Sequence, residues 1–140
     1  METWIIYAIL SMFFAGITSV LAKYGLKNIN PDFGLGIRTM VIFFIITLIN
    51  VVGNKYKDVG VLTLKQWILL IASGITTTLS WICYYRAMKD GLVSYVAAID
   101  KASIIITLLL SFLLLKEPCT PKILMGAGFI FVGMVILIWK

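Results

Sequence analysis

Histidine is absent from the 140-residue sequence, and charged residues make up only 13% of it. The missing histidine removes both the most common general base and the most common metal ligand. Soluble domains carry roughly 25% charged residues, so the low charge content excludes a soluble globular fold. The two cysteines, Cys83 and Cys119, lack the C-x-x-C spacing of metal sites. No metal and no cofactor is therefore predicted.

The residue patterns of enzymes are also missing. The sequence contains neither the H-E-x-x-H of metalloproteases nor the G-x-x-x-x-G-K of phosphate-binding loops. Of its six acidic residues, Asp100 alone is expected deep in the membrane, whereas proteolysis by buried carboxylates would need two. The basic residues lie mostly between apolar runs and form no basic face for nucleic acid. We expect neither an enzyme nor a nucleic-acid-binding protein.

Long apolar runs fill the sequence instead. Apolar residues make up 61% of the chain, and its mean hydropathy is +1.06. A helix needs about 20 apolar residues to cross a bilayer. No basic residue precedes the first run, so we expect a retained helix rather than a cleaved signal peptide. The pattern predicts an all-α integral membrane protein, one domain of five transmembrane helices over residues 3–22, 33–54, 66–87, 91–115 and 121–139.

The fourth run contains an adjacent acidic and basic residue, Asp100 and Lys101. The nine residues before the pair and the fourteen after it are each too short to cross the membrane, so the pair must lie within it. Each charge costs about 2.5–3.5 kcal/mol at the centre of a membrane helix, so such residues usually have a function. We expect Asp100 to bind a proton or a cationic substrate, with Lys101 displaced from it around the helix. The alternative is a structural ion pair with a partner on another helix.

Polar side chains form a stripe on each of two predicted helices. One stripe continues from Asp100 at three- and four-residue spacing through Ser103, Thr107 and Ser111. The other lies on the third helix, beside a tryptophan that is a candidate to stack on a substrate, and comprises Ser73, Thr77, Ser80, Trp81 and Tyr84. Together the stripes predict a substrate or ion pathway. The alternative is that the hydroxyls bond their own helix carbonyls and that Trp81 only packs.

Several further residues stand in a recognisable order along the chain. These are Lys23, Pro31, Arg38, the segment 85–97 (YRAMKDGLVSYVA), Lys116-Glu117-Pro118, Gly126, Gly128 and Gly133. This order covers essentially the whole chain and resembles the EamA domain of the drug/metabolite transporter superfamily. The half-size, five-helix bacterial and archaeal group is the most similar. Many EamA domains have a proline where Asp100-Lys101 stands, which marks the charged pair as the specialisation of this chain.

The resemblance implies half of an inverted-repeat transporter, because full-length relatives carry two such domains in opposite orientation around a substrate cavity. It implies secondary transport of a small metabolite, amine or drug-like solute, coupled to protons or to exchange, across the cytoplasmic membrane of a prokaryote. Alternating access by a dimer is the expected mechanism. The residues that match the family motif and are expected to be structural are Arg38, Arg86, Glu117, Gly126 and Gly133. Arg38 is expected to extend outward to the headgroups. The alternative function is a non-transporting membrane scaffold or assembly subunit.

Basic residues are divided almost evenly between the two sides of a five-helix topology. One side receives five of them, Lys55, Lys57, Lys65, Lys116 and Lys122, and the other receives six, Lys23, Lys27, Arg38, Arg86, Lys89 and Lys140. Orientation in the membrane follows the imbalance of Lys and Arg in short loops. The near balance predicts dual topology and favours an antiparallel homodimer over a parallel homodimer or a heterodimer with a different half.

Overall fold

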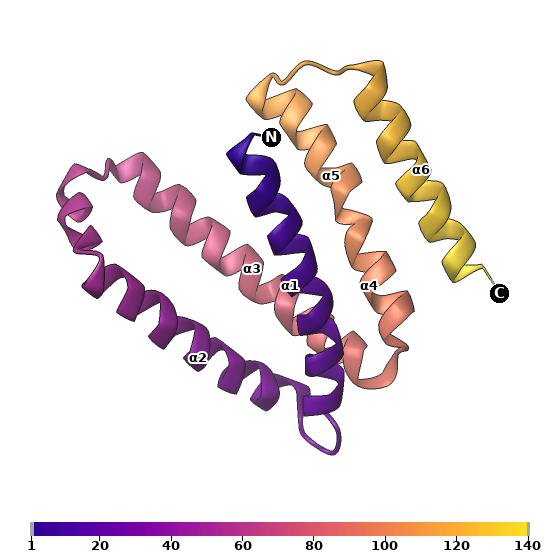
Figure 1. Ribbon diagram of the computed structural model, residues 1–140, viewed down its shortest axis with the longest axis horizontal. Coiled ribbons are helices and arrows are strands. Elements are labelled where there is room, and N and C mark those ends of the chain that lie inside the picture. The colour runs from indigo at the N-terminus through magenta and orange to yellow at the C-terminus, as the bar shows by residue number, and fades with distance from the viewer. Residues whose placement is uncertain (1, 140) are drawn as a thin grey trace. The chain divides into compact units, whose positions relative to one another are not determined.

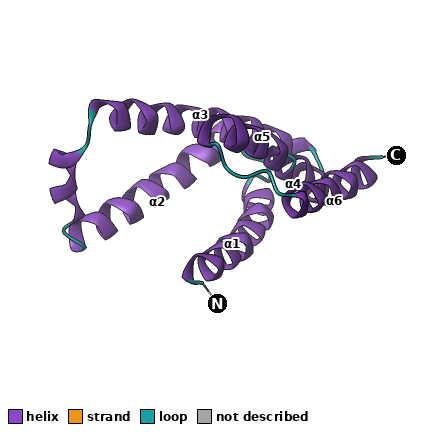
Figure 2. Ribbon diagram, turned by 90° about the horizontal axis from the view of Figure 1, so that it is seen from above, coloured by secondary structure: helices purple, strands orange, loops and turns teal. Residues whose placement is uncertain are grey.

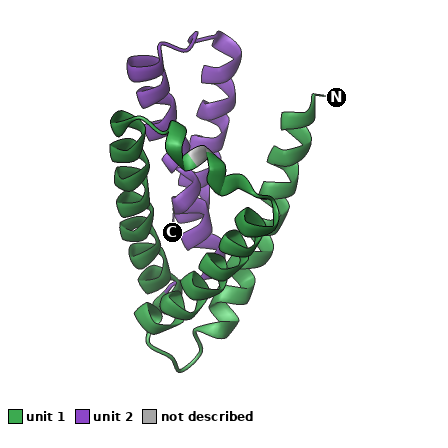
Figure 3. Ribbon diagram, turned by 90° about the vertical axis from the view of Figure 1, so that its left-hand side faces the viewer, with its two compact units in different colours: residues 1–90 green, residues 91–140 purple. Residues whose placement is uncertain are grey.

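The computed structural model describes residues 2–139, with the backbone alone at position 58. Lys140, one of the basic residues counted above, lies outside this range. The chain divides into two compact units, residues 1–90 and residues 91–140 (Figure 3). Across the described residues the regular structure is helical, with no strand (Figure 2). The expected all-α class is confirmed.

The first unit contains three long helices, α1 (Thr3–Gly25), α2 (Pro31–Val52) and α3 (Leu64–Asp90) (Figure 1). A 3₁₀ helix, Lys55–Val61, joins α2 to α3. Asn30 caps α2, because its side chain accepts a hydrogen bond from the Asp32 N–H at 2.8 Å. Pro31 takes the first helical position, where its missing N–H removes no intrahelical bond.

A capping box starts α3. The Thr63 N–H donates to the side-chain oxygen of Gln66 at 2.8 Å, and the Gln66 N–H donates to the Thr63 hydroxyl at 3.4 Å. This reciprocal arrangement satisfies two backbone donors that have no partner inside the helix. The helix therefore begins at Leu64, ahead of the predicted residue 66.

The second unit contains α4 (Val93–Lys101), α5 (Ser103–Leu110) and α6 (Pro121–Ile138). A single π-helical turn, Ser111–Leu115, ends α5. The α6 helix begins as α2 does, with Pro121 at its first position and the Thr120 hydroxyl accepting from the Ile123 N–H at 3.4 Å.

Five helical segments among the described residues are long and apolar enough to cross a membrane. Their bounds are Thr3–Gly25, Pro31–Val52, Leu64–Asp90, Val93–Leu115 and Pro121–Ile138. The predicted set of five spans is confirmed, with ends that differ by up to three residues. The fourth span differs in kind, because it is interrupted at Ala102 instead of running as one continuous helix.

Most large apolar side chains face outward, as expected where lipid is the solvent. The buried apolar side chains of the described residues are Leu26, Leu35, Tyr85 and Met88. All four belong to the first unit, near the end of α1, the start of α2 and the end of α3. The helices of this unit are thus fixed to one another at one end, where its polar residues also gather.

Candidate functional site

Two lysines tie α1 and α3 together at their C-terminal ends. The Lys23 ammonium donates to the carbonyls of Met88 at 2.8 Å and Lys89 at 3.0 Å. In return, the Lys89 ammonium donates to the carbonyls of Leu26 at 3.1 Å and Ile29 at 2.6 Å. The last carbonyls of a helix lack intrahelical partners and carry partial negative charge, so a cation satisfies both needs. Each helix end is therefore capped by a lysine of the other helix.

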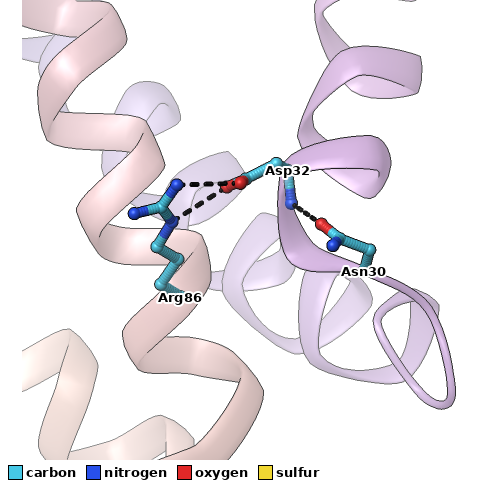
Figure 4. Close-up of polar contacts among 3 residues, drawn as sticks. All are labelled: Asn30, Asp32 and Arg86. Carbon is cyan, nitrogen blue, oxygen red and sulfur yellow. Dashed lines mark hydrogen bonds and ion pairs between the residues drawn. The ribbon is translucent and has the colours of Figure 1, made fainter.

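An ion pair joins the start of α2 to the last turns of α3 (Figure 4). The Arg86 Nε–H donates to Asp32 Oδ1 at 3.0 Å, and Nη2–H donates to Oδ2 at 2.8 Å. Two parallel hydrogen bonds of this kind fix orientation as well as distance. The Asn30 cap holds the Asp32 backbone from the other side, as Figure 4 shows. Arg86, which matches the family motif, thus has a positioning role between helices.

Arg38 lies against α3 instead of extending outward to the headgroups. Its guanidinium carbon is 4.6 Å from the Trp81 ring centre and 5.6 Å from that of Tyr85. Its Nη1–H donates to the Tyr85 hydroxyl at 3.3 Å. A guanidinium on an aromatic face is stabilised by the ring quadrupole, most strongly where water is scarce. The expectation of an outward Arg38 is wrong because α3 offers two ring faces and a hydroxyl within reach.

The polar stripe of α3 divides into two parts. Tyr84 bonds across to α1, with its hydroxyl 2.9 Å from that of Ser19. Ser19 donates its single hydroxyl proton to the Ala15 carbonyl at 3.0 Å, so Tyr84 is the donor of the pair. Further along α3, Thr77 donates to the Ser73 carbonyl at 2.8 Å within its own helix. Trp81 and Tyr84 therefore make contacts between helices, whereas Thr77 makes the local bond described by the alternative interpretation.

Asp100 and Lys101 pair with each other in the second unit. Lys101 Nζ lies 3.2 Å from Asp100 Oδ2, and their side chains are 66% and 37% exposed. The long lysine side chain reaches back across the 100° that separates adjacent residues on a helix. On its own helix, Thr107 donates to the Ser103 carbonyl at 3.0 Å. Asp100 thus has a cationic partner in the adjacent residue of its own helix.

The helix is irregular directly after this pair. The Ala102 N–H bonds to the Ile99 carbonyl at 3.0 Å, and the Ile105 N–H bonds to the Ala102 carbonyl at 3.0 Å. Both bonds span three residues instead of four, which tightens the helix locally. The backbone thus stays helical and hydrogen-bonded through Ala102, with a local tightening next to two charged residues.

Three residues that match the family motif lie in or near α6. The Glu117 N–H donates to the Ser111 carbonyl at 3.3 Å and so closes the π-helical turn. A Cβ added at Gly126 or Gly133 would meet no atom within 4 Å. The glycine face of α6 is therefore open enough for another helix to approach closely.

A groove of about 710 Å³ lies between α2 and α3. Its walls are mostly apolar, and the Asp32–Arg86 ion pair lies along it; the lining residues are Asp32, Leu35, Gly36, Thr39, Met40, Phe43, Phe44, Thr78, Ile82 and Arg86. Such a surface fits an apolar or amphiphilic guest, with the ion pair at its polar end. Sequence reasoning did not single out Asp32 or Lys89. A lysine in the last turn of two helices that end on the same side is the signal that points to the paired caps.

Five membrane-length helices, with charged residues inside them, define a multi-pass integral membrane protein. The chain belongs to the EamA-like transporter family, which it matches over residues 2–139, and it is therefore a membrane transporter.

Two relatives match over nearly their whole length. A Sinorhizobium protein described as an uncharacterized transporter in the cobO 3′ region is 35% identical over 136 residues, covering 97% of this chain and 96% of the relative. An uncharacterized protein of Methanocaldococcus jannaschii is 29% identical over 137 residues, covering 98% and 97% respectively. No solved structure matches the chain.

Proposed function

We propose that the chain is a secondary transporter, which moves a small metabolite, amine or drug-like solute by alternating access. The transporting unit is a dimer in the cytoplasmic membrane of a prokaryote, and transport is coupled to protons or to exchange. Asp100 is the coupling or cation site, and Lys101 balances its charge. The family supports transport as such; the solute class follows from the family resemblance, and the coupling is inferred from the chemistry of the charged pair.

One observation carries the proposal, namely the Asp100–Lys101 pair inside the span Val93–Leu115. Asp100 lies seven residues after Val93, which at 1.5 Å per residue is about 10 Å into the span. Ionisable residues at such depth are expensive and usually belong to ion or substrate pathways. The tightened turn at Ala102 adjoins the pair, and secondary transporters commonly bind their solutes near the midplane.

The geometry of the pair suggests how coupling would work. At 3.2 Å, the Lys101 ammonium occupies one carboxylate oxygen of Asp100. The other oxygen can bind a proton or a cationic solute, and these two compete for it. Occupancy by one cation then excludes the other, which is the condition that exchange requires. Ser103 and Thr107 extend the polar surface along α5 of the same membrane span.

Flux measurements with the purified full chain in proteoliposomes test this function. Solutes are first selected by their ability to raise the melting temperature of the native protein, because a ligand of the native fold stabilises it by mass action. We expect uptake of such a solute to respond to an imposed pH gradient. Asp100→Asn should reduce uptake to the level of protein-free liposomes without impairing membrane insertion.

Asp90→Asn is the matched control, because it removes an equal charge at the exposed end of α3. This variant should retain uptake and its pH dependence. If Asp100→Asn also retains both, Asp100 is not the coupling site. If the native protein moves none of the stabilising solutes, the scaffold alternative is favoured instead.

A further inference from the structure

A basic pocket lies at the C-terminal ends of α1 and α3, apart from the charged pair of the second unit. Its volume is about 390 Å³, and its lining residues are Lys23, Tyr24, Leu26, Lys27, Asn28 and Lys89. Three of these six residues are lysines, and the described lining contains no carboxylate. Asp32, a nearby acidic residue of α2, is held by both hydrogen bonds of Arg86.

The local charge of this pocket is positive even after the helix ends are counted. Two helix C-termini contribute roughly half a negative charge each and Asp90, next to Lys89, contributes one more, against three lysine ammonium groups, which leaves about one positive charge. The side chain of Lys27 makes no polar contact among the described residues, so its ammonium is available to a ligand. Lys89 uses two of its three N–H donors on carbonyls and retains one.

The loop that carries Lys27 is fixed by its own backbone and by Lys89. The Lys27 N–H donates to the Tyr24 carbonyl at 3.3 Å, and the Ile29 N–H donates to the Leu26 carbonyl at 3.2 Å. Lys89 holds the same loop through the carbonyls of Leu26 and Ile29. The basic side chains thus project from a preorganised frame, which lowers the cost of ordering them around an anion.

We propose that this pocket binds the phosphate headgroup of an anionic phospholipid. The pocket lies where two membrane-spanning helices end, which is the depth of lipid headgroups. Tyr24, one of its walls, is 76% exposed, as is usual for a tyrosine anchored at the membrane interface. Lys27 and the remaining donor of Lys89 supply the phosphate contacts. Basic pockets between transmembrane helices recognise anionic headgroups in this way. The site is independent of the transport activity proposed above.

Photo-crosslinking in nanodiscs tests the site directly. The full chain is placed in phosphatidylcholine nanodiscs that contain a small fraction of phosphatidylglycerol with a photoreactive headgroup, and crosslinked peptides are located by mass spectrometry. We expect crosslinks on the segment 23–28 or at residue 89. Lys27→Gln should lower their yield about fivefold at subsaturating lipid, the factor expected for one basic residue near an anionic surface. Lys27→Arg should restore it.

Lys57→Gln is the matched control, because it removes the same charge from the 3₁₀ helix at the opposite end of the same unit. It should leave crosslinking at 23–28 and 89 unchanged. An equal loss in both variants would reveal attraction by overall charge and would overturn the site, as would an unaltered yield in Lys27→Gln. If inorganic phosphate at an equal concentration of phosphate groups suppresses the crosslinks as well as unlabelled phosphatidylglycerol does, the ligand is a soluble anion and the lipid assignment is wrong.

Discussion

Lysine and arginine bind different partners at the end of the first unit where α1 and α3 terminate. Lys23 and Lys89 cap carbonyls, for which a compact ammonium with three donors is well suited. Arg86 meets a carboxylate, and Arg38 lies on aromatic rings, where the planar guanidinium can form two parallel bonds or stack. These four residues are therefore not interchangeable basic positions, and each substitution should have its own cost.

Lys89→Met should destabilise the first unit by about 1–3 kcal/mol, because it removes two hydrogen bonds from a charged donor. The substitution retains an apolar side chain of similar length but removes the donor to the carbonyls of Leu26 and Ile29. The Leu26 carbonyl keeps the hydrogen bond from the Ile29 N–H, whereas the Ile29 carbonyl loses its lysine donor. Thermal or denaturant unfolding in detergent measures the loss. Lys57→Met, at the opposite end of the unit, should change stability little, and equal losses in both would contradict the capping role.

At the scale of the helix, the start of α2 approaches the end of α1 closely enough to require a glycine. A Cβ at Gly34 would lie 2.7 Å from Leu26 Cδ2, whereas a Cβ at Gly36 would meet no atom within 4 Å. Alanine favours a helix over glycine at both positions, so this gain cancels in a comparison. Gly34→Ala must also displace the buried Leu26 side chain. We expect it to be less stable than Gly36→Ala by about 1 kcal/mol.

Equilibrium unfolding of the two alanine variants under the same detergent conditions measures this difference. Valine, a larger side chain, should increase the difference in stability between the variants at positions 34 and 36. If Gly34→Ala is as stable as Gly36→Ala, the Leu26 side chain moves aside without cost. The close approach of α1 and α2 then does not make glycine necessary for stability.

The spans could be predicted from the sequence because bilayer thickness fixes the length of an apolar run. The ends of the spans depend on helix-capping residues, which the sequence reveals only in part. Pro31 lies outside the predicted span 33–54, yet it starts α2 because Asn30 caps it. The capping box of Thr63 and Gln66 has a sequence signature, but the charge of Lys65 obscured it. No glycine or proline lies at the irregular turn around Ala102, so the sequence did not predict this turn.

In the candidate site, features within one helix could be predicted from the sequence, whereas contacts between helices could not. The pair Asp100–Lys101 was visible because a charge inside an apolar run stands out in one dimension. The stacking of Arg38 on Trp81 joins residues on two helices, so it depends on how α2 packs on α3. Thr77 shows the converse case, because its bond to the Ser73 carbonyl is local and was already foreseen as an alternative to a pathway role.

At the scale of the whole molecule, the distribution of basic residues hardly favours one orientation of the chain in the membrane over the other. Counted by the predicted spans, five basic residues fall on one side and six on the other, with Lys101 within the fourth span. Arg38, one of the six, lies seven residues inside α2. Orientation follows the excess of Lys and Arg in short loops, and here the excess is a single residue. In inverted-repeat carriers the cavity lies between two repeats of opposite orientation, and a second copy of this chain inserted in the opposite orientation would supply such a partner. We therefore predict that the chain inserts in both orientations and forms an antiparallel homodimer.

Cysteine labelling in intact cells tests this prediction. Cys83 and Cys119 are first replaced by serine, and a single cysteine is then introduced as Lys57→Cys or as Lys140→Cys, the latter position lying outside the described residues. With dual topology, a membrane-impermeant thiol reagent should label a fraction of each variant from outside. Adding two lysines to the loop that contains Lys57 should shift the fractions in opposite directions, because the added charge is retained on the cytoplasmic side. Labelling of one position only, complete from outside and unaffected by the added lysines, would show a fixed orientation and exclude the antiparallel homodimer.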